Sequence, residues 1–162
     1  MQNYAHFANF ICRFGPKKRL LDYAEEIVLP AFTNDTYIRD YANRTFYYLY
    51  ETTVDKIADI NGNPVLAVYG HYVKDTLLTR HQIFDKKKGL LKDQQTMRSS
   101  PSAFFVLILN NHRLVYMPET PHAPDLKSFE VTLTNFMKRR RKEYVNEIYN
   151  AHAERNKKMT KK

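Results

Sequence analysis

The residues with the clearest chemical potential in this sequence are clustered Lys and Arg side chains. Five consecutive basic residues occupy positions 138–142, and five more lie between positions 86 and 98. Clustered cations displace counterions from a polyanion, so phosphate contact is the chemistry that such clusters can perform. The candidate nucleic-acid-binding residues are therefore Lys138, Arg139, Arg140, Arg141, Lys142, Lys86, Lys87, Lys88, Lys92 and Arg98.

The net charge is concentrated near the end of the chain. The 162 residues hold 26 Lys and Arg against 17 Asp and Glu, a formal net charge of +9. Residues 138–162 hold ten basic and three acidic residues, so they account for +7, and residues 1–137 for only +2. Two other interpretations of the basic run stay open: a solvated helix segment favoured by the helix dipole, and contact with an acidic protein partner.

Tyrosines supply a second candidate surface. Exposed aromatic side chains beside basic residues can stack on the bases of single-stranded nucleic acid. The same side chains can instead pack in a core and across strands, which is the interpretation that we favour because no RNP-like pattern is present. An exposed aromatic sheet face could equally be a homodimer interface. The tyrosines concerned are Tyr47, Tyr48, Tyr50, Tyr69 and Tyr72.

Catalytic motifs are scarce. His71, His81 and Lys74 could form the acid, base and cation of a metal-independent ribonuclease if two neighbouring strands brought them together. We favour the simpler interpretation that these are ordinary half-exposed strand residues. The sequence has no zinc-protease, P-loop or nucleophile-elbow motif, and Cys12 is its one cysteine, expected as a buried inert thiol. We expect no catalytic residues, no metal site and no cofactor.

The N-terminal part predicts one strand and one helix. Hydrophobic residues alternate over 4–14, as in a half-buried strand. Apolar residues then recur at helical spacing over 17–28, and we expect Pro30 to end this helix. The polar segment 33–40 predicts a loop. The buried strand face would comprise Ala8, Phe10, Cys12 and Phe14.

The central part predicts an antiparallel meander followed by a loop. Segments 45–57, 65–74 and 76–84 are rich in aromatic and β-branched residues, with turns expected at Asn61-Gly62 and Lys74-Asp75. Segment 85–102 has little to bury and predicts a mobile basic loop. One face of the first strand would comprise Phe46, Tyr48, Tyr50, Thr52 and Val54.

The C-terminal part predicts a hairpin and a long helix. Segment 103–109 is apolar at every position, as in a strand covered on both faces or in the innermost strand of the sheet, and 112–117 would return beside it. Asp125 is an N-cap residue at the start of a helical apolar stripe that includes Phe129 and Leu133. Val145, Ile148 and Tyr149 extend this stripe past the basic run, so the helix is expected to reach about Ala153.

Together these elements predict an α+β fold. We expect a curved antiparallel sheet of about five to six strands with two helices on one face, in the order β-α-β-β-β-β-β-α. Residues 1–155 would form one domain, and 156–162 a basic polar tail or the start of a linker. No apolar run is long enough for a membrane helix, so we expect no membrane partner and a cytoplasmic location.

The sequence therefore predicts a non-catalytic nucleic-acid-associated domain that contacts the phosphates of DNA or RNA. The contacts would come from the basic C-terminal helix and the basic loop. The alternatives are a protein-protein interaction module, as a homodimer or an adaptor subunit, and the ribonuclease described above.

Overall fold

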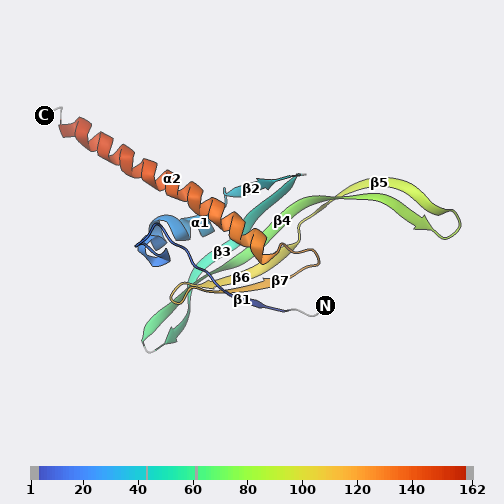
Figure 1. Ribbon diagram of the computed structural model, residues 1–162, viewed down its shortest axis with the longest axis horizontal. Helices are drawn as coiled ribbons and strands as arrows, with labels where there is room; N and C mark the ends of the chain where they lie inside the picture. The colour runs from blue at the N-terminus through green and yellow to red at the C-terminus, as the bar shows by residue number, and fades with distance from the viewer. Residues whose placement is uncertain (1–3, 43, 61, 160–162) are drawn as a thin grey trace.

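The computed structural model describes residues 4–42, 44–60 and 62–159 (Figure 1). Its main feature is an antiparallel sheet with strand order β1-β7-β6-β4-β3-β2, to which β5 adds by pairing with β4. This confirms the α+β class, with seven strands in place of the expected five to six. The strands are β1 (His6–Asn9), β2 (Ile38–Tyr41), β3 (Thr45–Ile60), β4 (Asn63–Asp85), β5 (Gly89–Ser99), β6 (Ser102–Ile108) and β7 (Arg113–Pro118).

The first helical segment continues past Pro30, contrary to prediction. A 3-10 turn η1 (Leu20–Tyr23) leads into a π-helical turn η2 (Ala24–Val28) and a short helix α1 (Leu29–Thr33). Pro30 lies in the first turn of α1, where a missing N–H costs little. The segment expected to be a loop after it contains the edge strand β2.

The long helix α2 (Leu126–Met159) begins as predicted. The Asp125 carboxylate caps it by accepting the backbone N–H of Ser128 at 2.7 Å. The apolar stripe from Leu126 to Met137 packs in the core, and Tyr144 packs against its edge. Val145 and Tyr149 are exposed, because from about that point the helix extends beyond the sheet (Figure 1). It ends at Met159, beyond the predicted end near Ala153 and inside the predicted tail.

The helices cover one face of the sheet. Phe129 of α2 lies between Phe105 and Tyr116, with ring centroids 5.0 and 5.4 Å away. The Tyr72 hydroxyl, on the same face, bonds to Thr132 of α2 at 2.7 Å. The predicted inner face of the N-terminal strand packs here as well, although only His6–Asn9 pairs as a strand. No described helical residue packs on the opposite face, which we call the open face.

The turn predicted between two central strands is absent. Segments 65–74 and 76–84 form the single strand β4, and Lys74-Asp75 makes no turn. The Asp75 carboxylate, which resembles a turn residue in the sequence, instead accepts the Arg98 guanidinium and the Ser100 hydroxyl. The first part of β4 pairs with β3 and β6, and the rest pairs with β5.

The predicted mobile loop 85–102 is mostly strand. The chain turns at 86–88 and returns as β5. Asp85 accepts the backbone N–H groups of Lys87 and Lys88, each at 2.8 Å, and Gly89 takes a φ of +75° that closes the turn. We call the ribbon of residues 76–99 the arm. Its first strand was predicted as 76–84, but its second strand β5 was missed, because both faces of the ribbon are solvated and no hydrophobic alternation marks β5.

A β-bulge divides β3 into two registers. The pairing with β4 shifts between Tyr50 and Thr53, and Glu51 takes a φ of +50°. Tyr48 and Tyr50 therefore lie on the open face while Val54 packs against the core, so the predicted shared face was wrong beyond the bulge. The predicted hairpin between β3 and β4 is confirmed by their pairing, although Asn61 lies outside the described residues.

Strand β6 is covered on one face only. Its burial alternates, with Ala103, Phe105 and Leu107 buried under the helices. Phe104, Val106 and Ile108 lie half-buried on the open face. Of the two expectations for this segment, the innermost position is confirmed, because β6 lies between β7 and β4 in the middle of the sheet. Cover on both faces was wrong, because a continuous apolar run does not say whether the second face has a partner.

Candidate nucleic-acid interface

The arm carries one group of predicted basic residues to an extreme of the molecule. Beyond Thr76 it is a two-stranded ribbon about 30 Å long at 3.3 Å per residue. Lys86, Lys87 and Lys88 form its terminal turn, and Lys92 lies on β5 near that turn. The ribbon and its tip stand away from the rest of the sheet (Figure 1).

Two of the basic side chains on the arm, Arg80 and Arg98, form salt bridges within the protein. Arg98 forms a hydrogen-bonded ion pair with Asp75 at the base of the arm, with Nε 2.9 Å from a carboxylate oxygen. This guanidinium lowers the pKa of the Asp75 carboxyl. Arg80 pairs with Asp93 partway along. Arg98 therefore holds the arm to the body.

The four lysines near the tip remain unpaired. Among the described residues no carboxylate forms an ion pair with them. They are available to an external anion. The residues concerned are Lys86, Lys87, Lys88 and Lys92.

Two exposed apolar side chains accompany these lysines. Phe84 and Leu90 are cross-strand partners one position before and after the closing pair, and they are 73% and 69% exposed. The register places Gln82 and Lys92 on the same face. The sequence analysis missed this pair because Leu90 was expected in a loop, although Phe84 ended a predicted strand. The signal was two apolar residues, Phe84 and Leu90, on either side of a turn.

The basic run of α2 divides by helix face. Arg140 lies against the first helical segment, where Nε donates to the Glu26 carbonyl at 2.8 Å and the guanidinium also pairs with Glu147. Arg139 lies over the ring of Tyr37 at 4.4 Å and pairs with Glu143. Both guanidinium groups are thus engaged by other residues of the same chain.

Tyr37 belongs to the same cluster, because it contacts both Arg139 and Glu143. Its hydroxyl donates to the Glu143 carboxylate. Burial, and after it the hydrogen bond to Glu143, raises the pKa of Tyr37 to about 12, so the phenol stays protonated at neutral pH. The cluster therefore balances two arginines with two glutamates and leaves no net cation there for phosphate.

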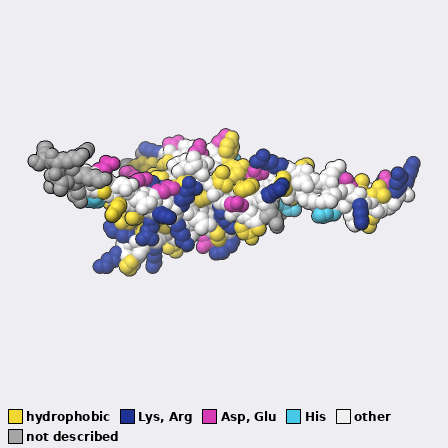
Figure 2. All heavy atoms as spheres, turned by 90° about the horizontal axis from the view of Figure 1, so that it is seen from above, with side chains coloured by type: hydrophobic (Ala, Val, Ile, Leu, Met, Phe, Trp, Pro, Cys, Tyr) yellow, Lys and Arg dark blue, Asp and Glu magenta, His cyan; other side chains and the backbone are white. Residues whose placement is uncertain are grey.

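The other three basic residues of the run face outward. Lys138, Arg141 and Lys142 line one shallow groove together with Val145 and Asn146. Their spacing of three and four positions places them on one helix face. Figure 2 shows blue side chains both at the extreme tip of the arm, at the right, and around the body toward the other end. The two predicted groups thus lie toward opposite ends of an elongated molecule and do not form one groove.

The predicted aromatic platform is also divided. Tyr47 and Tyr72 stack in the core with centroids 5.7 Å apart, so they are closed to bases. Tyr48, Tyr50 and Tyr69 lie on the open face. The expected core packing is therefore confirmed for two of the five tyrosines.

The ribonuclease set is not assembled. His71 lies on the open face, where Nδ1 contacts the Glu119 carboxylate at 2.9 Å. His81 is ten residues farther along the same strand, about 33 Å away. Lys74 lies on the helix side, in a hollow that Arg39 and Lys127 also line. No group of three potential metal ligands occurs in the described part of the chain.

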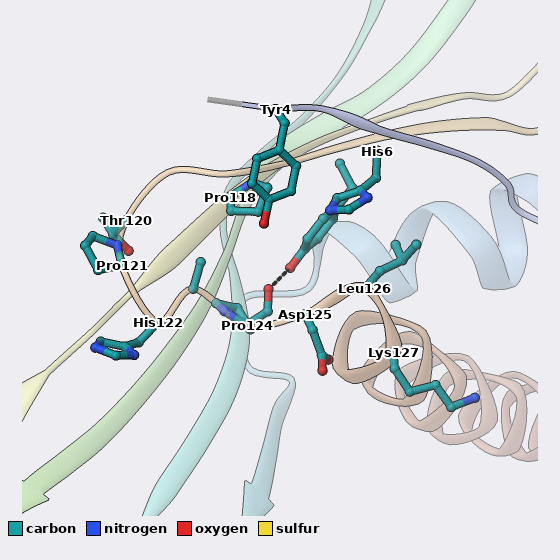
Figure 3. A pocket seen from close by; sticks show the side chains of 12 residues that line it. Tyr4, His6, Pro118, Thr120, Pro121, His122, Pro124, Asp125, Leu126 and Lys127 are labelled. Carbon is teal, nitrogen blue, oxygen red and sulfur yellow. Dashed lines mark hydrogen bonds between the residues drawn. The ribbon is translucent and has the colours of Figure 1, made fainter. Parts of the chain in front are cut away.

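Two further features of the described residues are a hollow beside β1 and the single thiol. A hollow of about 520 Å³ lies between β1, the 118–125 connection and the start of α2. Its central polar atoms bond to each other, with the Tyr116 hydroxyl donating to the Pro124 carbonyl at 2.5 Å, and His6 and His122 lie at opposite sides of it (Figure 3). Cys12 is half-buried with its thiol 3.6 Å from the Met137 sulfur, and burial raises its pKa. Neither feature brings a nucleophile and a base together.

Comparisons of this chain with protein-family models, curated proteins and solved structures find no match. In the part of the chain that the structure describes, no helix combines the length and apolar character needed to cross a membrane.

Proposed function

We propose that this protein is a non-catalytic nucleic-acid-binding protein whose principal contact element is the arm. The observation that supports it is the combination at the tip: lysines without ion-pair partners among the described residues, beside the exposed Phe84 and Leu90. A two-stranded ribbon fits the width of a duplex major groove. Lysines at its turn would meet phosphates, while apolar side chains near a ribbon tip can press against sugars or bases.

The outer face of α2 is the second contact of this proposal. Lys138, Arg141 and Lys142 project from it, whereas Arg139 and Arg140 are engaged in contacts with Glu143 and with the Glu26 carbonyl. Because this face and the arm tip lie toward opposite ends, a short oligonucleotide would engage one and a long duplex both. The affinity is expected to rise with the length of the nucleic acid.

A salt-dependent titration tests the proposal. Fluorescence anisotropy with labelled DNA and RNA, single- and double-stranded, would be measured between about 50 and 200 mM salt, where counterion release dominates affinity. Three phosphate contacts correspond to a slope of about −2.7 in a plot of log affinity against log salt on duplex DNA. The variant K86Q/K87Q/K88Q should lose that part of the slope.

The control is a variant with the same change in net charge away from the arm. Lys17, Lys18 and Lys127 are exposed elsewhere, and K17Q/K18Q/K127Q should bind almost as the unaltered protein does. Equal weakening by both triple variants would show that net charge alone attracts nucleic acid and would refute the assignment to the arm. Absence of binding at low salt would refute the function.

A further inference from the structure

The open face of the sheet carries an apolar surface that nothing in the described part of the chain covers. Phe7 is 78% and Tyr50 54% exposed there. Val73, although buried, belongs to this face and not to the helix-covered core cluster. Contiguous exposed apolar surface of this kind marks interaction sites. The apolar members are Phe7, Ile38, Phe46, Tyr48, Tyr50, Tyr69, Val73, Phe104, Val106, Ile108, Val115 and Met117.

The size of this face matches a stable protein interface. Six strands spaced about 4.8 Å apart give a width of about 24 Å. With the polar positions included, about twenty side chains point outward from it, and a standard interface uses about 20 to 30 residues on each side. One sheet face is therefore large enough to hold a partner without help from the helices.

The charge of the face disfavours nucleic acid as its occupant. On a chain with a net charge of +9, the face carries Asp40, Asp55 and Glu119, while Arg113 is its basic strand residue apart from the Asp75-bound Arg98. Phosphates would meet carboxylates here. An apolar protein surface with a complementary distribution of a few charges fits better.

The strand register makes the face complementary to itself. Asp55 on β3, Ala67 on β4, Ile108 on β6 and Arg113 on β7 lie in one row across the sheet. This row begins with an acid and ends with a base, at equal distances from the line between β4 and β6.

A second row, two rows away on the same face, has the same relation. It runs from Tyr50 through His71 and Phe104 to Met117 on the same four strands. Consider a twofold axis that lies above the open face, parallel to the strands and midway between β4 and β6. Rotation about this axis places β7 of a second copy over β3 of the first, and β6 of the second copy over β4. It would set Tyr50 against Met117, and His71 against Phe104, so aromatic and flexible apolar side chains would meet across the interface.

We propose that the protein forms a homodimer by packing two open faces against each other about this twofold axis. The two sheets would lie about 10 Å apart, as in sandwiches, in an isologous interface. Asp55 of each copy would then face Arg113 of the other. Because the axis runs along the strands, both arms would project from the same end of the dimer.

Sedimentation equilibrium over a wide concentration range tests the dimer and its geometry. The unaltered protein should dimerise, and Asp55→Arg or Arg113→Asp should each raise the dissociation constant about tenfold or more by placing like charges together. The double variant D55R/R113D should restore dimerisation. Within one copy about 14 Å separates β3 from β7, so an internal ion pair does not explain such a rescue.

Phe84→Ser on the arm is the matched control, because it removes an exposed aromatic that lies outside the interface. It should leave the dissociation constant unchanged. A monomer at every concentration overturns the proposal, as does a dimer that is indifferent to both single reversals or is not rescued by the double variant. Nucleic-acid binding is measured separately, so either proposal can fail alone.

Discussion

Arg140 provides the sharpest test of how the basic run is used. Its side chain is 17% exposed and donates from Nε to the Glu26 carbonyl at 2.8 Å, tying α2 to the first helical segment. Arg140→Met keeps the helix propensity and the apolar stem but removes the donor. A hydrogen bond involving a charged group contributes about 1.5–3 kcal/mol, and the low end applies to a partly exposed pair. We therefore expect unfolding to become about 1.5–2 kcal/mol easier.

Thermal and urea unfolding followed by circular dichroism measure this loss. For a chain of this size, 1 kcal/mol corresponds to about 2–4 °C in Tm, so Arg140→Met should lower Tm by about 3–8 °C. Lys138→Met, two positions earlier and outward-facing, should change the free energy of unfolding by less than about 0.5 kcal/mol. Equal stability of the two variants would refute the division of the run into packing and free residues.

Two further predictions concern the sheet. A Cβ at Gly70 would lie 2.9 Å from the Thr52 Cα and 3.1 Å from the Glu51 carbonyl oxygen, so Gly70→Ala should push the bulge away and cost about 1–3 kcal/mol, measured by urea unfolding; an Ala variant as stable as the parent would contradict this. Because Arg98 holds the pKa of Asp75 below its ordinary 3.8, this pair stabilises the fold above that pH and loses its contribution as pH falls through the lowered value. Asp75→Asn should accordingly unfold with a weaker dependence on pH between about 5 and 2, and an unchanged acid-unfolding curve would contradict the assignment.

Elements with a complete local signal were predictable. The cap at Asp125 and the stripe through Phe129 and Leu133 lie within three turns of one helix, and the structure confirms both. The alternation from Ala8 to Phe14 identified a face that packs against the core even where strand pairing is interrupted. Such signals are contained in neighbouring residues, so they need no tertiary partner to be read.

Strand β5 of the arm shows why other elements were missed. A hydropathy pattern reflects which residues are buried, and a ribbon that is exposed on both faces therefore shows no clear alternation of apolar and polar residues. Asp75 beside Lys74 resembled a turn because its partner Arg98 is 23 residues away, on a strand that was not expected. The bulge at Glu51 also has no local signal in the sequence, because it depends on the space that Gly70 leaves on the neighbouring strand.

The sequence by itself determined the α+β class, the capped C-terminal helix and the concentration of charge in residues 138–162. Only the tertiary structure decided which cations are free. Arg140 donates to the carbonyl of Glu26, 114 positions earlier in the chain, whereas Lys86, Lys87 and Lys88 lie at the tip of a two-stranded ribbon. The physical reason is range: propensity, capping and net charge belong to local segments, whereas ion pairing and the face that a side chain occupies depend on strand register and on contacts between distant segments.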